Sequence, residues 1–298
     1  KNLSRSVVQA DWLEKNLDNP DVKIIEVSTE AGLYERGHIK NAVKFNWYTD
    51  LVEVVNRDIV AGARFQKLAR AAGINKNSTV VLYGDKNNWF AAWGAWIFNT
   101  YGIEDVRLVD GGRVKWEKDG RPFTTVVPAP KEGNFVATKA DKSIRATLIR
   151  DVLPAVRKKG SADLVDIRSA DEYNGKIFAP AGFQELAVRA GHIPGAVNVP
   201  WGANVNADGT FKTVAELKKL YADKGIDGKK PIITYCRIGE RASHSWFVLS
   251  QIMNLPSNFL PDVALMTLAI ALVVTIGIGL AGTWRILGQK AAPVLREL

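Results

Sequence analysis

The chain repeats one sequence unit, and this repeat restricts its fold more than any other feature of the 298 residues. Three stretches recur in the same order, each with a similar pattern of apolar residues and glycines. The matched pairs are VKIIEVS (22–28) with ADLVDIRS (162–169), RGHIKNAVKFNW (36–47) with AGHIPGAVNVPW (190–201), and STVVLYGDKNNWFAAWGAWIF (78–98) with PIITYCRIGERASHSWFVL (231–249). We therefore expect two domains that share one fold.

Each unit alternates short apolar runs with longer amphipathic segments such as residues 63–74 and 214–226. This alternation predicts an α/β fold in which a parallel sheet is flanked by helices. Residues 126–142 are rich in Pro, Lys and small side chains, as linkers are. The predicted domains are a first unit at 1–125 and a second unit at 143–256, on either side of that linker.

The repeat weakens near the end of the second unit. In the first unit, Val106 to Trp116 reads as a strand, a glycine turn and the start of a helix. The same distance from Tyr235 leads to Asp262, where no such pattern is found. We therefore expect the second unit to be truncated, without its last strand and helix.

A long apolar segment follows at Val263–Trp284 and contains no charged residue. About 20 apolar residues span the hydrocarbon core of a bilayer, so this segment is predicted to be a transmembrane helix in contact with lipid. The tail at 285–298 carries Arg285, Lys290 and Arg296. The positive-inside bias would place this tail in the cytoplasm and the two units in the periplasm. Without the tail, we would expect a soluble bacterial protein of the cytoplasm or the periplasm.

The net charge of +9 attracts anions, but the basic residues are scattered along the chain. We therefore expect solvated basic faces and no nucleic-acid partner. One cysteine cannot form an internal disulfide, and three dispersed histidines do not form a zinc-type cluster. The sequence gives no sign of a metal site or a cofactor.

Cys236 is the single cysteine, and it follows the predicted strand Ile232–Tyr235. It would lie in a strand-to-helix turn, at the sheet edge where open α/β folds bind ligands. Converging backbone N–H groups and the arginines Arg237 and Arg241 would favour an exposed thiolate nucleophile. The alternative is a buried cysteine that only packs. The first unit has Gly84 where the second has Cys236, so thiol chemistry is expected in the second unit alone.

Several other side chains are less informative. His38 and His192 occupy matching positions in the two units, which favours a structural role. His244 falls early in the predicted helix 242–252 and is expected to cap or pack rather than act as a base. Arg189 stands just before GHIPGA, and both a binding role and a structural role stay open.

VDIRSADEY (165–173), RAGHIPGAVNVPW (189–201) and YCRIGERASHSWF (235–247) together resemble the tandem-domain rhodaneses, or thiosulfate sulfurtransferases. The resemblance covers about residues 3–253 and implies an inactive first domain and a catalytic second one. It implies that Cys236 forms a persulfide in a loop whose backbone amides hold the substrate. The residues implied to bind the donor are Arg237, Arg241, Arg189, Ile238, Gly239, Glu240 and Trp201. The implied partners are thiosulfate and a thiophilic acceptor: cyanide, a thiol or a reduced thioredoxin-like protein.

Other activities stay open at this point. Relatives that use 3-mercaptopyruvate tend to carry a small residue after the cysteine, whereas Arg237 suits the doubly charged thiosulfate. Cysteine phosphatases and arsenate reductases of this fold have a Cys-x5-Arg loop, whereas Cys236 to Arg241 is Cys-x4-Arg. The tail 260–298 resembles the last membrane helix of an ABC-type permease of the lipoprotein-release kind. An inactive rhodanese-permease chimera, merely associated with membranes, is therefore a further alternative.

Overall fold

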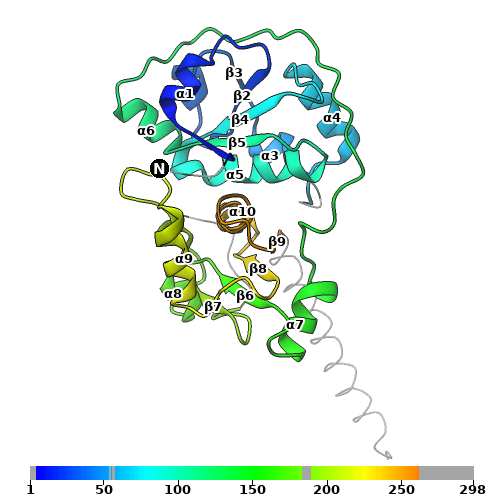
Figure 1. The fold of residues 1–298 in the computed structure, drawn as a ribbon, viewed down its shortest axis with the longest axis vertical. Helices are drawn as coiled ribbons and strands as arrows, with labels where there is room; N and C mark the ends of the chain where they lie inside the picture. Colours follow the sequence, from blue (N-terminus) through cyan, green and yellow to red (C-terminus); the bar gives the residue numbers. More distant parts are fainter. Residues whose placement is uncertain (1–4, 54, 56–57, 183–188, 262–298) are drawn as a thin grey trace, which may run out of the picture.

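The computed structural model describes residues 5–53, 55, 58–182 and 189–261. These residues form two α/β units, each built around a parallel sheet (Figure 1). This confirms the predicted fold class at the level of two parallel sheets flanked by helices.

The first unit has a five-stranded sheet in the order β1-β5-β4-β2-β3, in which the pairs of strands are parallel. Its strands are β1 (Val7–Val8), β2 (Val22–Glu26), β3 (Ala42–Lys44), β4 (Thr79–Tyr83) and β5 (Val106–Val109). Its helices are α1 (Ala10–Lys15), α2 (Leu33–Arg36), α3 (Trp47–Asp50), α4 (Gly62–Ala71), α5 (Asp85–Thr100) and α6 (Gly112–Lys118). The four residues Val80–Tyr83 of the central strand β4 are buried, as parallel strands covered on both faces are.

The second unit has a four-stranded parallel sheet in the order β7-β6-β8-β9. Its strands are β6 (Asp163–Asp166), β7 (Val197–Asn198), β8 (Ile232–Tyr235) and β9 (Ser257–Leu260). Its helical segments are η1 (Leu148–Val152), α7 (Leu153–Arg157), α8 (Ala170–Tyr173), η2 (Trp201–Asn204), α9 (Val214–Ala222), α10 (Glu240–Trp246) and η3 (Phe247–Ile252). This order repeats β5-β4-β2-β3 of the first unit.

The prediction that the second unit lacks its last strand is wrong. Strand β9 pairs in parallel with β8, with Thr234 opposite Phe259 and Tyr235 opposite Leu260. It therefore holds the place that β5 holds beside β4. The sequence SNFL has few β-branched residues and resembles VRLV only weakly, but pairing with β8 and burial of Phe259 and Leu260 decide its conformation. The position beside the cysteine strand is thus filled.

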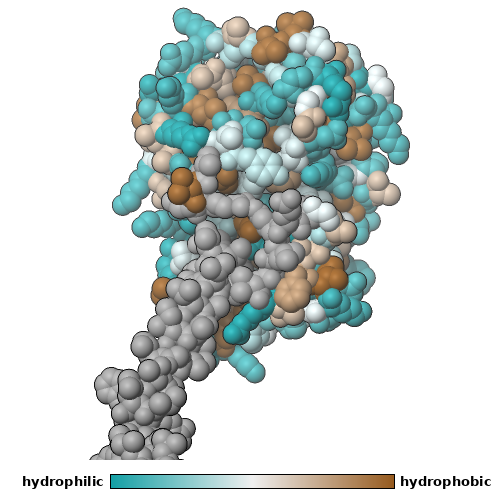
Figure 2. All heavy atoms as spheres, turned by 180° about the vertical axis from the view of Figure 1, so that it is seen from behind, coloured by the Kyte–Doolittle hydropathy of each residue, from teal (hydrophilic) through white to brown (hydrophobic). Residues whose placement is uncertain are grey.

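The predicted transmembrane helix at 263–284 and the basic tail at 285–298 lie outside the described residues. Within the part of the chain that the structure describes, no helix is both long enough and apolar enough to cross a bilayer. On the uncovered part of the face in Figure 2, hydrophilic and hydrophobic residues are interspersed.

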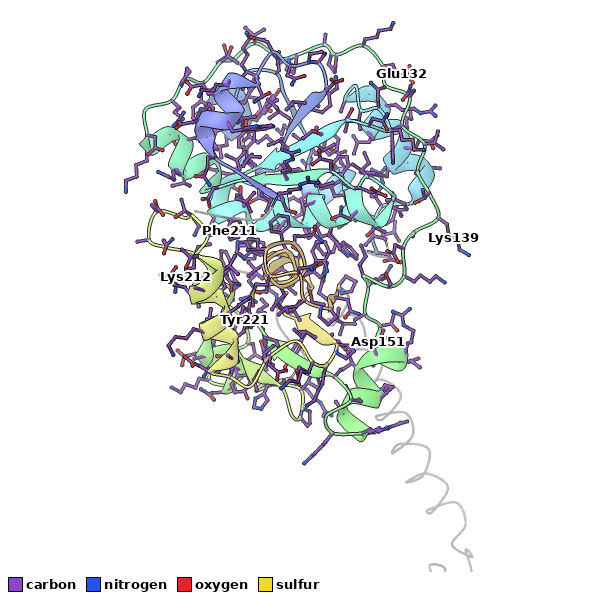
Figure 3. All side chains as sticks on the ribbon, viewed as in Figure 1. Glu132, Lys139, Asp151, Phe211, Lys212 and Tyr221 are labelled. Carbon is purple, nitrogen blue, oxygen red and sulfur yellow. The ribbon has the colours of Figure 1, made fainter. Side chains whose placement is uncertain are left out.

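Helix α5 of the first unit packs against α10 of the second, and this contact lies between the two sheets (Figure 1). A hydrogen bond joins the units close by, where the backbone N–H of Phe211 donates to Asp110 Oδ1 at 2.8 Å. Figure 3 labels Phe211 beside α10 at this boundary. The linker runs around the outside of the first unit and buries Phe135 against it. The first unit therefore forms part of the surroundings of α10.

The two histidines of the repeat have the same structural role. The rings of Tyr34 and His38 stack at 3.7 Å, and those of Tyr173 and His192 stack at the same distance. In each pair, the histidine Nδ1 lies 2.9 Å from the backbone oxygen of the tyrosine. Each tyrosine hydroxyl then donates to a backbone oxygen at the start of the next strand, Ala42 or Ala196. These contacts fix the loop before that strand.

A candidate active site after strand β8

Strand β8 delivers Cys236 to the carboxyl edge of the second sheet, as the sequence predicted. The strand comprises the predicted residues Ile232–Tyr235, and α10 begins at Glu240, two residues earlier than expected. We call residues 236–241 the cysteine loop. It lies between a buried strand and a helix N-terminus, where backbone N–H groups are available to an anion.

The thiol of Cys236 is enclosed by its own loop. The backbone N–H of Gly239 donates to Sγ at 3.1 Å, and the thiol donates to Glu240 Oε2 at 3.4 Å. Gly239 has φ +90°, and a Cβ there would lie 2.4 Å from the Cα of Pro261. The turn therefore needs glycine, because the chain after β9 packs directly on it.

The expectation of an exposed, readily ionised thiol is wrong for this conformation. Cys236 is 1% exposed. Burial, and secondly the Glu240 carboxylate, raise the pKa of the thiol to about 12, although Arg241 and the backbone amides of Ala242 and Ile238 act in the opposite direction. The sequence showed the arginines but could not show that the thiol is out of contact with water.

Each of the two loop arginines faces a carboxylate. Arg237 Nη2 lies 3.4 Å from Glu240 Oε1. Arg241 makes a bidentate pair with Glu172 of α8, with both N···O distances at 2.8 Å. These side chains are 0–3% exposed. Burial raises the pKa of Glu172, but the pairing with Arg241 outweighs it, and the pKa is lowered. Arg241 therefore anchors the cysteine loop to α8.

Aromatic side chains from both units stand beside this pair. The guanidinium of Arg241 lies 5.9 Å from the centre of the Trp89 ring in α5. The ring centres of Trp89 and Trp201 are in turn 5.2 Å apart. The His244 ring packs between those of Trp201 and Phe211, with distances of 5.2 and 5.3 Å between ring centres. Burial lowers the pKa of His244 to about 4, so this histidine is neutral and packs, as the sequence suggested.

The remaining candidate residues are less closely linked to the thiol. Ile238 is half-buried and packs on the core. Arg189 is exposed, and its side chain neither hydrogen-bonds nor ion-pairs with any residue that the structure describes. The structure thus brings together the cysteine loop and Trp201 but gives no contact between Arg189 and the loop.

Sequence reasoning missed Glu172 and Trp89. Glu172 stands in a capping box with Ser169, a pattern that indicates a helix start but not an ion pair 69 residues away. Trp89 occupies the position of Arg241 in the unit predicted to be inactive. The repeat could have located it, since the packing of α5 on α10 brings the two matching loops together.

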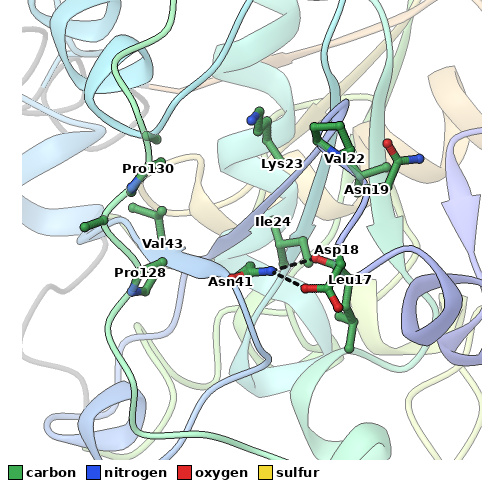
Figure 4. Close-up of a pocket in the computed structure, with 13 residues that line it drawn as sticks. Leu17, Asp18, Asn19, Val22, Lys23, Ile24, Asn41, Val43, Pro128 and Pro130 are labelled. Atoms are coloured by element: carbon green, nitrogen blue, oxygen red, sulfur yellow. Dashed lines mark hydrogen bonds between the residues drawn. The ribbon is translucent and has the colours of Figure 1, made fainter.

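A pocket of about 250 Å³ elsewhere in the first unit is not part of this site. Residues at the start of β2, including Val22 and Ile24, line it together with Asp18, Asn41 and Pro128 (Figure 4). It lies at the amino end of the sheet, whereas Cys236 lies at the carboxyl end of its own. Across the described ranges, no group of three or more His, Cys, Asp or Glu residues is arranged to hold a metal ion.

Comparisons with known proteins agree on a family. The family profile described as rhodanese-like domain matches residues 9–119 and again 151–266. A Mycolicibacterium smegmatis protein named as a thiosulfate sulfurtransferase is 49% identical over 250 residues, which cover 83% of this chain and 88% of that protein. The sulfur carrier protein TtuD of Thermus thermophilus is 47% identical over 253 residues, which cover 84% of this chain and 88% of that protein.

A solved structure supports the same fold. The 3-mercaptopyruvate sulfotransferase SseA of Escherichia coli superposes with a TM-score of 0.74 at 27% sequence identity. The superposition covers 86% of this chain and 98% of that one.

Proposed function

This chain belongs to the rhodanese family, and from that premise we propose that it is a sulfurtransferase in which Cys236 carries sulfane sulfur from thiosulfate to a thiophilic acceptor. One observation carries the proposal: the single cysteine of the chain stands in a loop with an N–H donor 3.1 Å from its sulfur and two arginines beside it. Such a loop can hold both a sulfur nucleophile and an anionic donor.

The reaction proceeds in two steps. The Cys236 thiolate attacks the outer sulfur of thiosulfate, the S–S bond of thiosulfate breaks, and its electron pair leaves on sulfite. The resulting persulfide is held by the amides of Ile238, Gly239 and Glu240. An acceptor such as cyanide, a thiol or a reduced thioredoxin-like protein then takes the outer sulfur and restores the thiolate.

The basic side chains have different roles in this proposal. Arg237 attracts the sulfonate of the donor, with Arg189 as a second cation at the mouth of the site. Arg241 is already bound by Glu172, so it holds the loop in place and contributes its charge from within. Trp201 and Trp89 form the apolar wall. The first unit, residues 1–125, contributes Trp89 to this wall and has no nucleophile of its own.

A single-turnover experiment tests this function. Mixing the protein with thiosulfate alone is expected to release one sulfite per chain, and adding cyanide then gives one thiocyanate. Cys236→Ser is expected to release none, while Ser245→Ala keeps the full amount as a control in α10. Sulfite release that is undiminished in Cys236→Ser would rule the proposal out.

A second donor, 3-mercaptopyruvate, is favoured by the fold shared with SseA. We expect thiosulfate to give the higher kcat/KM, because the residue after the cysteine is Arg237, whose guanidinium suits a doubly charged donor. The reverse order in a side-by-side assay would assign the enzyme to mercaptopyruvate. Hydrolysis of an aryl phosphate without sulfur transfer would assign it to the phosphatases instead.

We also propose that residues 263–284 span a bilayer and tether the two units to it. The support is sequence alone: 22 residues without a charge are followed by a basic tail, and residues 260–298 together resemble the last membrane helix and tail of a permease of the lipoprotein-release kind. In a membrane fractionation, the full chain is expected in the pellet after alkaline carbonate extraction, and a chain ending at Pro261 in the supernatant. Sulfite release by both forms would separate an active tethered enzyme from an inactive chimera.

A further inference from the structure

The side chain of Glu240 lies between the thiol and the two arginines of the cysteine loop. Its Oε2 accepts from the thiol at 3.4 Å. Its Oε1 lies 3.4 Å from Arg237 Nη2 and 3.8 Å from Arg241 Nε. The residue is 2% exposed. One carboxylate thus contacts the reacting sulfur with one oxygen and two fixed cations with the other.

We propose that Glu240 is the proton acceptor for Cys236, so that the reactive thiolate forms by proton transfer inside the closed loop. The inference rests on the proposed sulfur transfer at Cys236. In this step the S–H bond breaks, an O–H bond forms on Oε2, and the electron pair stays on sulfur. The pair keeps a total charge of −1, and no proton needs to reach solvent.

Direct proton transfer is favoured over loss of the proton to water because Cys236 and Glu240 are both buried. Losing the thiol proton to water would place a second negative charge beside the carboxylate in a region of low dielectric, which is costly. Transfer to Glu240 instead moves a single charge over 3.4 Å. Burial raises the pKa of Glu240 as well as that of Cys236, which brings the carboxylate closer to the range in which it can hold a proton. The two groups therefore titrate as a coupled pair.

Among the residues that the structure describes, the other charged groups around the pair do not offer this route. Arg237 and Arg241 remain cations and stabilise whichever member of the pair is ionised. Glu172 of α8 is occupied by Arg241, with N···O distances of 2.8 Å. His244 of α10 is fully buried between aromatic rings, and burial lowers its pKa to about 4. Glu240 is the acceptor in direct contact with Sγ.

The proton balance closes over the full cycle. The thiolate attacks thiosulfate and sulfite leaves as the dianion while the proton stays on Glu240. After the acceptor removes the outer sulfur, the proton returns from Oε2 to the regenerated thiolate. Glu240 is then an anion again, as at the start.

The test is the pH dependence of thiol reactivity. We would measure two rates between about pH 7 and about pH 9: alkylation of Cys236 by iodoacetamide, and single-turnover sulfite release from thiosulfate. A shared proton predicts rates that change less than twofold in the unmodified protein, because the fraction of internal thiolate does not depend on pH there. In Glu240→Gln, the thiol must lose its proton to water, so both rates should rise about tenfold per pH unit.

Two further variants serve as controls. Glu117→Gln makes the same change on an exposed residue of α6 and should keep the flat profile. Glu240→Asp keeps a carboxylate, so its rates should stay independent of pH, although they should be lower. If Glu240 had only a structural role, Glu240→Asp and Glu240→Gln would show the same pH dependence. Thermal melting checks that each variant folds.

Several results would overturn the inference. A tenfold rise per pH unit in the unmodified protein would do so without any variant, even if Glu240→Gln failed to fold. An equally flat profile in Glu240→Gln would do so too, because the thiol would then ionise without the carboxylate. The alkylation data decide this question even if thiosulfate gives no sulfite, an outcome that would instead refute the proposed function.

Discussion

The loops that follow the two central strands begin from matching positions but take different backbone paths. In the first loop, residues 84–88, a Cβ on Gly84 would lie 2.2 Å from the backbone oxygen of Val27. Three consecutive residues of that loop, Lys86 to Asn88, have positive φ values. In the second unit the same position carries the Cys236 side chain. The first unit therefore lacks the nucleophile and also the backbone path that would accommodate one.

The buried cations beside the two central strands also come from different elements. In the first unit Arg113 of α6 pairs with Glu26 at 3.0 Å and donates to the backbone oxygen of Gly37. In the second unit Arg168, just after β6, pairs with Asp166 at 2.6 Å and donates to the oxygen of Gly191, the residue that matches Gly37. Since Arg168 makes both contacts from its own loop, the second sheet does not depend on a counterpart of α6 for them.

His38 and His192, the two histidines of the repeat, differ in exposure. His38 is 0% exposed, because its backbone pairs with Thr124 and its Nε2 lies 3.0 Å from the backbone oxygen of Val126. His192 is exposed, and within the described ranges no segment pairs with it in that way. The segment after α6 thus closes this side of the first unit.

The largest expected effect concerns the ion pair between Arg241 and Glu172. The first loop has no such pair, because Trp89 stands in the position of Arg241. Arg241→Ala leaves Glu172 buried and unpaired, so the free energy of unfolding should fall by about 3–5 kcal/mol in urea denaturation. Lys219→Ala, which breaks an exposed pair on α9, should leave it unchanged. A loss below about 1 kcal/mol in Arg241→Ala would mean that this pair does not anchor the cysteine loop.

The next effect concerns His244 of α10, the helix that packs against α5, whose ring lies between Trp201 and Phe211. Its folded pKa of about 4 lies below the ordinary value of 6.5, so the unfolded chain binds this proton first. Stability should therefore be lost as the pH falls from about 6.5 to about 4, by about 3 kcal/mol from this group. Urea denaturation at several pH values should show that the loss of stability between about pH 6.5 and about pH 4 is smaller by this amount in His244→Phe. Identical slopes in the two proteins would contradict the burial of a neutral histidine here.

Gly84 tests whether the first loop could have held a side chain. Gly84→Ala should destabilise the protein by about 1–3 kcal/mol, because its Cβ would meet the Val27 carbonyl. Gly202→Ala, with no atom within 4 Å of the added carbon, should have little effect. The free energies of unfolding of both variants, from urea denaturation, would measure this difference. Equal stability of the two would show that the first loop differs from the second in sequence alone.

The smallest expected effect lies where the first unit meets the active site. Trp89→Phe reduces the ring that faces Arg241 and Trp201, at a cost of about 1 kcal/mol, or about fivefold in kcat/KM for thiosulfate. Trp12→Phe, against Arg107 on the far side of the first unit, should keep the rate. If both variants matched the unmodified protein, the first unit would contribute no wall to the site.

The sequence predicted the repeat, the parallel sheets, strand β8 and the turn at Cys236, because these depend on local patterns of apolar residues and glycine. It failed at β9, where the residues SNFL become a strand only by pairing with β8. It also failed on the state of the thiol, because burial and the contact with Glu240 are properties of the folded loop. The partnership of Arg241 with Glu172 spans 69 residues and leaves no local sign.

Thiol chemistry is expected in the second loop alone, and peptide mass spectrometry after incubation with thiosulfate can check this. The peptide containing Cys236 should gain the mass of one sulfur atom, and cyanide should remove it again. The peptide containing Gly84 should stay unchanged. A wild-type Cys236 peptide that gains no sulfur, or a gain on any other peptide, would show that Cys236 is not the sulfur carrier.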